Sequence, residues 1–426
     1  MIAASKKLFS SFNNKAALLF SSSSVILSLV KLVSGVVIIK WVIPEDIGLW
    51  NSISLLQSYT AILTLGMLSG LNRELPYYMG KGDQDYIVKL AQTTLYFVRI
   101  LNVIVSIATV LTLVYIYYFV SRDVKLLFGL LSIGIIIVTA FYNTYLSVTY
   151  RASSEFIKLS KMQLYISGFT LISVILPYYY SYYGLVIRTV LVSIFSVAVI
   201  YVVRPLKVKA AYDKKSFKEL IKTGIKLYAI GYLDDISKTF NRTILLTYGG
   251  VLLVGYFSPA IAVITGMTIF PSAMAQYIYP QMSFNFGKYN DPRNLWGWVW
   301  KSALGMLAIG LPLIVMGWLL IPYFIKEFFP NYLESIFATQ MALLAGVFDS
   351  ATIGTQVLNT LKSFKWLTVL TVFKLALLWF TMSYFASVMN PLEGVSIGMV
   401  IASIIFWVIS MLVCYKETHN FSSKKV

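Results

Sequence analysis

Cysteine and histidine are almost absent from the sequence, which has one of each, Cys414 and His419, among 426 residues. A single cysteine excludes a disulfide within the chain, and one residue of each kind argues against a zinc site with Cys and His ligands. Charged residues are also scarce, at 12% against about 25% in soluble domains. The sequence has no Walker A motif and no other glycine-rich nucleotide loop, which argues against ATP hydrolysis by this chain.

Apolar residues dominate instead, at 58% of the sequence, and give a mean hydropathy of +0.77. Helices that cross a bilayer need roughly 20 mainly apolar residues, and twelve segments qualify. They are about 16–42, 49–75, 90–120, 124–150, 163–179, 184–203, 220–248, 255–282, 296–321, 333–359, 366–389 and 394–415. The first is longer than the core of a signal peptide, so we expect a retained helix. The predicted fold is an all-α polytopic membrane protein with twelve transmembrane helices in two pseudo-symmetric six-helix bundles.

The basic residues of the predicted loops and flanks lie almost entirely on one side of this topology. The opposite side holds only Arg122, Lys125 and Lys326. Because loops rich in lysine and arginine stay in the cytoplasm, both termini are expected to be cytoplasmic. This placement accounts for most of the net charge of +18, so we expect no nucleic acid partner.

The two halves of the chain resemble each other when the sequence is shifted by 207 residues, the spacing between Lys31 and Lys238. The same shift places Gly48-Leu49-Trp50 on Gly255-Tyr256-Phe257, and residues 78–83 on 285–290. Each half holds an even number of predicted spans, so the repeat is parallel, and transporters of this kind bind substrate between the halves near the midplane. The predicted domains are an N-terminal bundle over 1–204, a basic cytoplasmic linker over 205–219 and a C-terminal bundle over 220–426.

Seven charged residues stand well inside the apolar segments. A charge at the centre of a membrane helix costs about 2.5–3.5 kcal/mol on insertion scales, so it persists only where it faces protein or water inside the fold. The seven are Lys31, Asp234, Asp235, Lys238, Arg242, Asp349 and Lys374. Cations outnumber acids among them, which predicts a wet and mildly electropositive cavity.

The seventh predicted segment carries four of these charges. Asp234, Lys238 and Arg242 are spaced i, i+4 and i+8, so they share one face of a helix, and Asp235 lies at its edge. One interpretation is a salt-bridge ladder that only holds helices together. The other is a cavity wall on which Lys238 and Arg242 bind substrate while Asp234 and Asp235 couple an ion.

Further charged residues are candidates for the same cavity. Lys31, at midspan and in the repeat position of Lys238, is expected to bind substrate or else to form a buried ion pair. Lys374 and Arg99 lie about two turns inside the cytoplasmic ends of their segments, and snorkelling to the interface is the alternative to substrate binding. Asp349 could pair with Lys374 on the neighbouring helix or bind a coupling ion.

Two of the predicted connections between segments also stand out. Arg73-Glu74 closes the second segment on the cytoplasmic side, where it could form an inner gate or an ordinary interfacial pair. Tyrosines crowd residues 178–183, which are predicted to form the outer turn between the fifth and sixth segments.

Several short motifs, taken in order, resemble those of Wzx-type polysaccharide flippases. The motifs are Pro44-Glu45-Asp46-Ile47-Gly48-Leu49-Trp50, Gly70-Leu71-Asn72-Arg73-Glu74-Leu75-Pro76, Val254-Gly255-Tyr256-Phe257-Ser258, Tyr279-Pro280-Gln281-Met282 and Phe328-Phe329-Pro330-Asn331-Tyr332. The resemblance covers most of the chain. Many relatives have Asp-Arg where this chain has Asn241-Arg242, which puts an acidic role at that position in doubt.

The resemblance implies membership of the multidrug/oligosaccharidyl-lipid/polysaccharide exporter superfamily and a location in the bacterial inner membrane. It implies a non-enzymatic flippase that moves an undecaprenyl-pyrophosphate-linked oligosaccharide to the outer leaflet by alternating access. Its partners are then a lipid-linked anionic oligosaccharide, membrane lipids and the polymerase and chain-length regulator of the same pathway. No cofactor is expected apart from a proton or sodium ion as the coupling ion. Lysines and arginines in the cavity would offset the desolvation of the phosphates.

Three other functions fit parts of the sequence. A multidrug/cation antiporter of the same superfamily should have a net acidic cavity, which the small excess of cations argues against. A major-facilitator transporter should carry Gly-x-x-x-Asp-Arg-x-Gly-Arg after the second segment, and the chain lacks it there. A membrane polysaccharide polymerase needs a large outer loop, which the predicted topology does not contain.

Overall fold

The computed structural model describes residues 2–289 and 291–420, without the side chains of residues 2–18, 227 and 420 and of several residues between 273 and 289. This part of the chain is 90% helical and contains no strand, which confirms the predicted all-α class. The third anchor of the predicted repeat, at 285–290, and Tyr279-Pro280 of the family motifs lie largely outside the described side chains.

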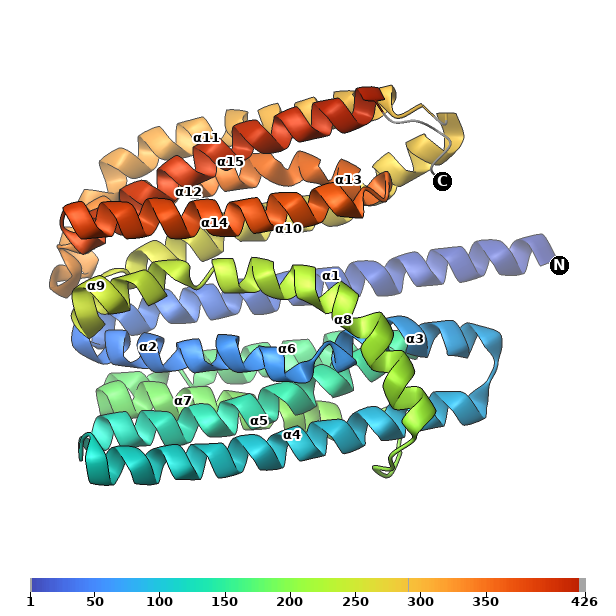
Figure 1. Ribbon diagram of the computed structural model, residues 1–426, viewed down its shortest axis with the longest axis horizontal. Helices are drawn as coiled ribbons and strands as arrows, with labels where there is room; N and C mark the ends of the chain where they lie inside the picture. Colours follow the sequence, from blue (N-terminus) through green and yellow to red (C-terminus); the bar gives the residue numbers. More distant parts are fainter. Residues whose placement is uncertain (1, 290, 421–426) are drawn as a thin grey trace. The chain divides into compact units, whose positions relative to one another are not determined.

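The helices form two compact units. Figure 1 colours the helices along the sequence, from blue at the N-terminus to red at the C-terminus. Unit 1 comprises Met1–Val42 and Ile53–Tyr232, and unit 2 comprises Ile43–Ser52 and Leu233–Val426. The helices α2 and α8 therefore each contribute to both units. These units describe packing, and the division into halves at 1–204, 205–219 and 220–426 stays a prediction.

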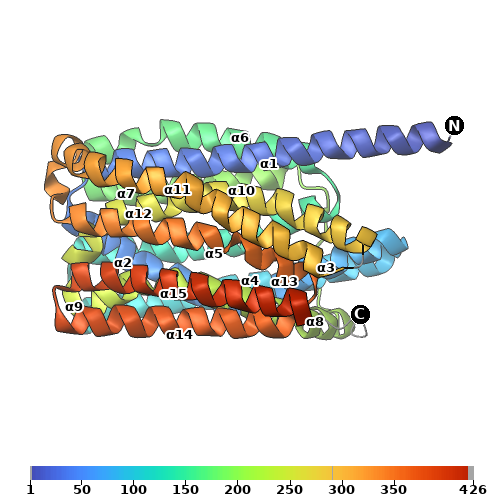
Figure 2. The same cartoon turned by 90° about the horizontal axis from the view of Figure 1, so that it is seen from above.

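Unit 1 is built from long helices joined by short turns. Its helices are α1 (Ile2–Trp41), most of α2 (Pro44–Thr60), η1 (Ala61–Thr64), α3 (Met67–Lys81), α4 (Gln84–Phe119), α5 (Val124–Ala152), α6 (Phe156–Ile172), α7 (Ile175–Val202) and the first part of α8 (Lys214–Ser237). The helix α1 packs on α6 (Figure 2), and α5 packs on both α4 and α7, as their contacts show. Ser23 of α1 donates a hydrogen bond to Gln163 of α6 over 2.6 Å, which ties two apolar helices by a polar contact.

Unit 2 centres on α12, which packs against α10, α11 and α15. Its helices are α9 (Phe240–Tyr256), α10 (Ser258–Tyr289), α11 (Arg293–Phe328), η2 (Pro330–Tyr332), α12 (Ser335–Ala351), η3 (Thr352–Thr355), α13 (Gln356–Thr360), α14 (Phe364–Val388) and α15 (Pro391–Asn420). Small residues let the other helices approach α12 closely, since Ala338, Ala342 and Ala345 are almost fully buried.

Eight helices of the described part are long and apolar enough to span a membrane, and two bent helix pairs raise the number to ten. The bends are 53° between α2 and α3 and 78° between α9 and α10. The helix α6 has 17 residues, fewer than the roughly 20 that a span needs. The chain is thus a multi-pass membrane protein, whereas the number of twelve spans stays a prediction.

The predicted turn at residues 178–183 is present, although it lies inside the bounds of α7. Ser181 has φ 47° and ψ −121°, which interrupts the helix. A Cβ on Gly184 would lie 2.1 Å from the carbonyl oxygen of Leu176, so the chain folds back tightly at this point. Tyr178, Tyr179 and Tyr180 are exposed on this turn, as expected for residues at a membrane interface.

The first part of α8 is held within unit 1 by contacts at its N-terminal end. Asp213 caps the helix by accepting hydrogen bonds from the backbone N–H and hydroxyl of Ser216, which lowers the pKa of Asp213. Glu219 accepts hydrogen bonds from the hydroxyls of Tyr78 over 2.8 Å and Tyr86 over 2.5 Å. One carboxylate therefore joins α8 to α3 and α4.

A glycine contact then lets α8 approach α3 at backbone distance. A Cβ on Gly224 would lie 2.0 Å from the carbonyl oxygen of Gly66, and a Cβ on Gly70 would lie 2.2 Å from that of Leu220. Only glycine permits such an approach, which is how small residues make membrane helices pack. The start of α8 is consequently fixed to unit 1, while its last residues belong to unit 2.

Replacing Glu219 by glutamine is expected to destabilise this junction. Glutamine keeps one acceptor oxygen but loses the charge that strengthens both tyrosine hydrogen bonds, at about 1–3 kcal/mol in total. The thermal unfolding midpoint of the purified protein should fall. Glu155→Gln is the matched control, because the Glu155–Lys158 pair is solvent-exposed and such pairs contribute about 0–1 kcal/mol. Equal midpoints for the two variants would contradict a role for Glu219 in fixing α8.

A second glycine contact, within unit 2, joins the start of α2 to the end of α9. A Cβ on Gly48 would lie 2.0 Å from the oxygen of Val251, and a Cβ on Gly255 would lie 1.9 Å from the oxygen of Pro44. Asn51 donates a hydrogen bond to Ser258 over 3.0 Å. The predicted shift of 207 residues relates Gly48 to Gly255, Pro44 to Val251 and Asn51 to Ser258. Reciprocal contacts of this kind are what a two-fold relation requires, so the structure supports the repeat at this point.

Candidate functional site

The seventh predicted segment, 220–248, is two helices and not one. The helix α8 ends at Ser237 and α9 begins at Phe240, so the break falls on Lys238 and Thr239. The hydroxyls of Ser237 and Thr239 bond back to the carbonyls of Asp234 and Ile236. Serine and threonine that bond back to preceding carbonyls bend helices. The break therefore lies among the charged residues of this segment.

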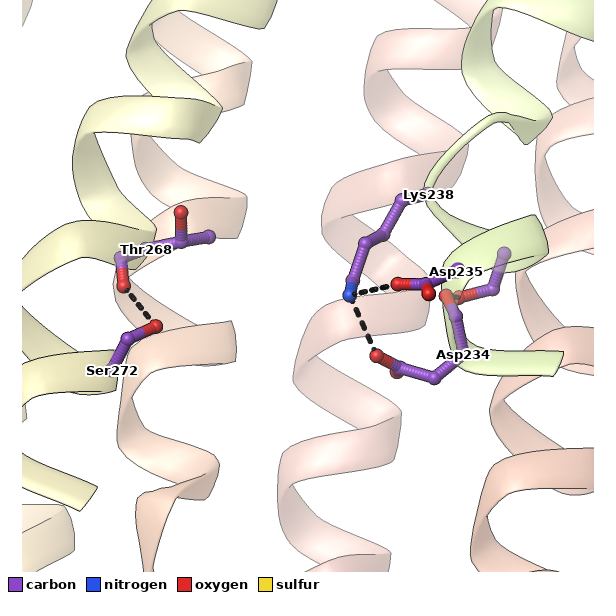
Figure 3. A network of polar contacts seen from close by, with 6 residues as sticks. Asp234, Asp235, Lys238, Thr268 and Ser272 are labelled. Atoms are coloured by element: carbon purple, nitrogen blue, oxygen red, sulfur yellow. Dashed lines mark hydrogen bonds and ion pairs between the residues drawn. The ribbon is translucent and has the colours of Figure 1, made fainter. Parts of the chain in front are cut away.

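Lys238 forms ion pairs with both acids that precede it. Its Nζ lies 2.8 Å from Oδ2 of Asp234 and 2.9 Å from Oδ1 of Asp235, as Figure 3 shows. The side chains of the three residues are 60%, 44% and 74% exposed, in the order Lys238, Asp234 and Asp235. Pairs this exposed contribute about 0–1 kcal/mol. The predicted i, i+4 pairing is thus present, but it is weak enough for a ligand to displace.

The exposed pairs also change the local charge. Two carboxylates around one ammonium leave a net negative charge at Lys238, so an electropositive cavity depends on the other cations. Arg242 lies in the first turn of α9 and is partly buried, beyond the break. The regular i+8 spacing from Asp234 does not extend across a broken helix, and this corrects the predicted continuous stripe.

The other two labelled side chains of Figure 3 are the hydroxyl-bearing Thr268 and Ser272 of α10. Thr268 and Ser272 are both exposed, and Ser272 donates its hydroxyl hydrogen to the carbonyl of Thr268 over 2.6 Å. Both residues belong to unit 2, as do Lys238 and its two acids. Exposed threonine and serine in an apolar helix offer hydrogen bonds to a polar ligand.

The other predicted cations are held in different surroundings. Lys31 is exposed on α1, and Arg99 is exposed on α4. Lys374 of α14 is partly buried, and its Nζ lies 5.3 Å from the centroid of the Phe406 ring on α15. This contact is a cation–π interaction, in which the ring face attracts the ammonium. The roles of these residues in substrate binding stay predictions.

The structure shows the surroundings of two further predicted acids, Asp349 and Glu74. Asp349 of α12 has one carboxylate oxygen buried without a hydrogen-bond partner. Pairing with Lys374 was one of two alternatives for Asp349, and no ion pair joins the two among the described residues; Lys374 contacts Phe406 instead, and binding of a coupling ion by Asp349 stays a prediction. Glu74 is almost fully buried and pairs with its neighbour Arg73 over 3.6 Å within unit 1, whereas an inner gate formed by this pair stays a prediction.

Two polar residues that the structure singles out, Arg188 and Glu219, were not among the predicted site residues. Arg188 is 9% exposed and donates a hydrogen bond to the carbonyl of Thr170, while its Nε has no partner. Thr170 precedes the break between α6 and α7, where the backbone N–H of Val174 bonds to Leu171, and the Thr170 carbonyl accepts from the Ser173 hydroxyl and from Arg188. Glu219 was missed because it stands among loop lysines. Its spacing gave no signal of the tyrosines on α3 and α4.

Within the described residues, no group of three or more His, Cys, Asp and Glu side chains could hold a metal ion. The polar groups at the α8–α9 break are one lysine, two carboxylates and nearby hydroxyls. Such a set can bind and release a charged group, and it contains no arrangement of nucleophile and base.

Sequence similarity to a protein family places the chain in that family. A sequence model for the family described as "Polysaccharide biosynthesis protein" matches residues 42–336. The chain belongs to this polysaccharide biosynthesis protein family. The predicted relationship to polysaccharide exporters is confirmed at the level of family and fold. No curated protein matches the chain significantly.

Solved structures similar to this member of the family include transporters. One is an inward-facing multidrug resistance MATE family transporter of the MOP superfamily, with a TM-score of 0.74, 15% identity, and coverage of 94% of this chain and 96% of that chain. Another, an outward-facing MATE transporter of that superfamily, has a TM-score of 0.65 and 16% identity, and the match covers 96% of each chain. Identities this low show the shared fold alone.

Proposed function

We propose that the chain flips an undecaprenyl-pyrophosphate-linked oligosaccharide from the cytoplasmic to the outer leaflet of the bacterial inner membrane by alternating access. The observation that carries this proposal is the broken helix at Lys238, which exposes charge inside a predicted membrane span. The family match supports a step in polysaccharide biosynthesis, and the MATE fold supports transport. Both termini lie in the cytoplasm in this proposal, as the distribution of basic residues predicts.

The ion pairs at the break suggest how an anionic head group is handled. A pyrophosphate that joins lipid and sugar carries two negative charges on several acceptor oxygens, so it can compete with Asp234 and Asp235 for Lys238. Because the exposed pairs contribute about 0–1 kcal/mol, little is lost when Lys238 changes partner. The two released carboxylates can then bind a proton or sodium ion, which would couple the movement of the substrate to that of an ion.

A second candidate function follows from the same geometry. Two acids for one lysine give the break a net negative charge, which suits a cationic substrate. The solved structures with this fold include multidrug resistance transporters. A cation exporter is therefore the alternative to a flippase, and the two differ in what accumulates when the protein is absent.

Deletion of the gene from its host tests the proposal. We expect lipid-linked repeat units to accumulate on the cytoplasmic leaflet and surface polysaccharide to fall at least tenfold, with unchanged resistance to cationic drugs. Extracted lipid-linked sugars measured by mass spectrometry, and surface polymer measured by gel, provide the readout. The intact gene on a plasmid is the control. Normal surface polymer together with new drug sensitivity would reject the flippase in favour of the cation exporter.

A further inference from the structure

Two arginines of unit 1, Arg99 on α4 and Arg204 just after α7, converge on tyrosines of α5, the helix that packs on both α4 and α7. Both arginine side chains interact electrostatically with the hydroxyls of Tyr142 and Tyr145. The ring centroid of Tyr142 lies 6.1 Å from that of Tyr201 on α7, and the guanidinium carbon of Arg204 lies 3.8 Å from the Tyr201 centroid. We call Arg99, Tyr142, Tyr201 and Arg204 the arginine–tyrosine cluster.

Hydrogen bonds hold α5 against both neighbouring helices at this level. The hydroxyl of Tyr145 donates to the carbonyl of Ala91 on α4 over 3.3 Å. The hydroxyl of Tyr150 donates to the carbonyl of Ile200 on α7 over 2.9 Å. The backbones that carry the cluster are therefore held in a fixed arrangement within unit 1.

Arg99 lies on a face of α4 that is otherwise apolar and exposed. Val103, Ile107 and Val110 follow it at i+4, i+8 and i+11, and the side chains of all three are more than half exposed. An exposed apolar stripe on a membrane helix faces acyl chains, since lipid tails are as apolar as these side chains. Arg99 is itself exposed at the end of this stripe, where an arginine extends toward the head groups.

The cluster lies about one hydrocarbon thickness away from the opposite ends of its helices. Arg99 comes 20 residues before Phe119, the last residue of α4, and Arg204 comes 21 residues after Tyr183 of the tyrosine-rich turn. At 1.5 Å per residue, either separation is about 30 Å, which is the thickness of a hydrocarbon core. The exposed aromatic rings of Phe119 and Tyr183 suit one interface, so the cluster lies at the other, near the lipid phosphates.

The groups that the cluster offers to a ligand are hydrogen-bond donors. Within the residues that the structure describes, neither arginine forms an ion pair, and the hydroxyls of Tyr142 and Tyr201 form no hydrogen bond. Arg204 donates one N–H to the carbonyl of Tyr201 over 3.1 Å, and four more N–H donors remain in the plane of its stacked guanidinium. The nearby Glu155 is paired with Lys158 over 2.8 Å. Two guanidinium groups and two free hydroxyls suit the oxygens of a phosphate.

The linker after Arg204 adds positive charge beside the cluster. It is fixed to α4 where the ring of Tyr212 lies 5.7 Å from that of Tyr96, one turn before the arginine of that helix. Between these two points Lys207 and Lys209 are exposed. Clusters of basic residues directly beside a membrane helix attract anionic lipids.

We propose that the arginine–tyrosine cluster binds the phosphate of an anionic phospholipid on the lipid-facing surface of unit 1, in the leaflet that is cytoplasmic in the proposed topology. The guanidinium groups and tyrosine hydroxyls donate to the phosphate oxygens, and the acyl chains lie along the apolar face of α4. The site goes beyond the proposed transport and does not depend on it. Arg99 thus binds a lipid of the membrane and not the transported head group. A pyrophosphate on the transported lipid offers the same chemistry, so the experiment compares the two.

The variants remove charge or a hydroxyl from the cluster. The double variant Arg99→Gln/Arg204→Gln removes both charges, and Tyr142→Phe removes one hydroxyl while the ring stays. Arg122→Gln is the matched control, because the guanidinium of Arg122 also lies over a tyrosine, 5.3 Å from the centroid of Tyr117, but at the opposite end of α4.

Native mass spectrometry of the purified full-length protein, titrated with phosphatidylglycerol, measures the affinity for each bound lipid. We expect the tightest phosphatidylglycerol site to weaken at least tenfold in the double variant and a few-fold in Tyr142→Phe. Arg122→Gln should equal the wild type, and phosphatidylethanolamine, which has no net charge, should bind equally to all variants. Thermal unfolding midpoints show that each variant is folded, and Arg99→Gln alone replaces the double variant if that variant is not.

Two results would overturn the lipid site. One is equal affinity for phosphatidylglycerol in the wild type, the double variant and Tyr142→Phe, or no preference of the wild type for it over phosphatidylethanolamine. The other is a double variant that keeps phosphatidylglycerol but binds undecaprenyl pyrophosphate at least tenfold more weakly, which would assign the cluster to the transported lipid. Binding is measured on the purified protein, so a gene deletion that leaves surface polysaccharide unchanged rejects the flippase and not this site.

Discussion

Replacement of Gly48 or Gly255 by alanine is expected to prevent the start of α2 from packing on the end of α9, and to leave little folded protein. The added Cβ would lie 2.0 Å from the Val251 oxygen in one case and 1.9 Å from the Pro44 oxygen in the other. Both obstacles are backbone atoms, which cannot rotate away as a side chain does. The helices must separate, so the cost should reach or exceed the upper end of the 1–3 kcal/mol typical of overpacking.

Two other glycines provide matched controls for this prediction. A Cβ on Gly35 of α1 or on Gly231 of α8 would meet nothing within 4 Å. Alanine there should leave the yield unchanged or raise the stability by up to about 1 kcal/mol, because alanine favours a helix. The amount of monodisperse protein in detergent, followed by fluorescence size-exclusion chromatography, gives the readout. Yields of Gly255→Ala equal to those of Gly231→Ala would show that the contact is dispensable.

The glycine contact also shows what the sequence could and could not reveal about the fold. Hydropathy predicted the all-α class, because apolar segments of membrane length leave few alternatives. The shift of 207 residues marked Gly48 and Gly255 as equivalent. Equivalence does not imply contact, and only the structure shows that the two glycines pack against each other's segments. The signal was nevertheless present, since two glycines at equivalent positions of the repeat are what a close two-fold crossing of helices requires.

For the charged residues too, the sequence predicted contacts within a helix but not contacts between helices. Pairing of Lys238 with Asp234 and Asp235 followed from spacing within one helix, where neighbours three and four residues apart must meet. The break at Lys238 depends on serine and threonine hydroxyls that bond to the backbone, and such bonds also occur in unbroken helices. Contacts between helices could not be predicted, because the sequence does not show in which direction the Lys374 side chain points. In the structure the Lys374 ammonium lies over the Phe406 ring, and Oδ1 of Asp349 has no hydrogen-bond partner.

Lys238→Ala and Arg242→Ala are each expected to reduce surface polysaccharide at least tenfold without loss of protein. The exposed ion pairs of Lys238 contribute about 0–1 kcal/mol, so their removal should not unfold the chain. A head group that crosses hydrocarbon loses a charge-assisted hydrogen bond of about 1.5–3 kcal/mol with each missing cation. Complementation of the deletion strain, with protein measured by immunoblot, checks the expectation. Lys31→Ala should give a similar defect if Lys31 and Lys238 are equivalent by the repeat.

Removal of the acids distinguishes the transport role of Lys238 from a structural one. If the ion pairs only hold α8 and α9 together, the defect of Lys238→Ala comes from two carboxylates left without a cation. Asp234→Asn and Asp235→Asn, added to Lys238→Ala, should then restore the polymer. If Lys238 binds the anionic head group, removal of the acids cannot replace the missing ammonium, and the triple variant stays defective. Restoration would return the α8–α9 break to a purely structural role, whereas a persistent defect, with Lys238→Arg active, would assign the cation to the substrate.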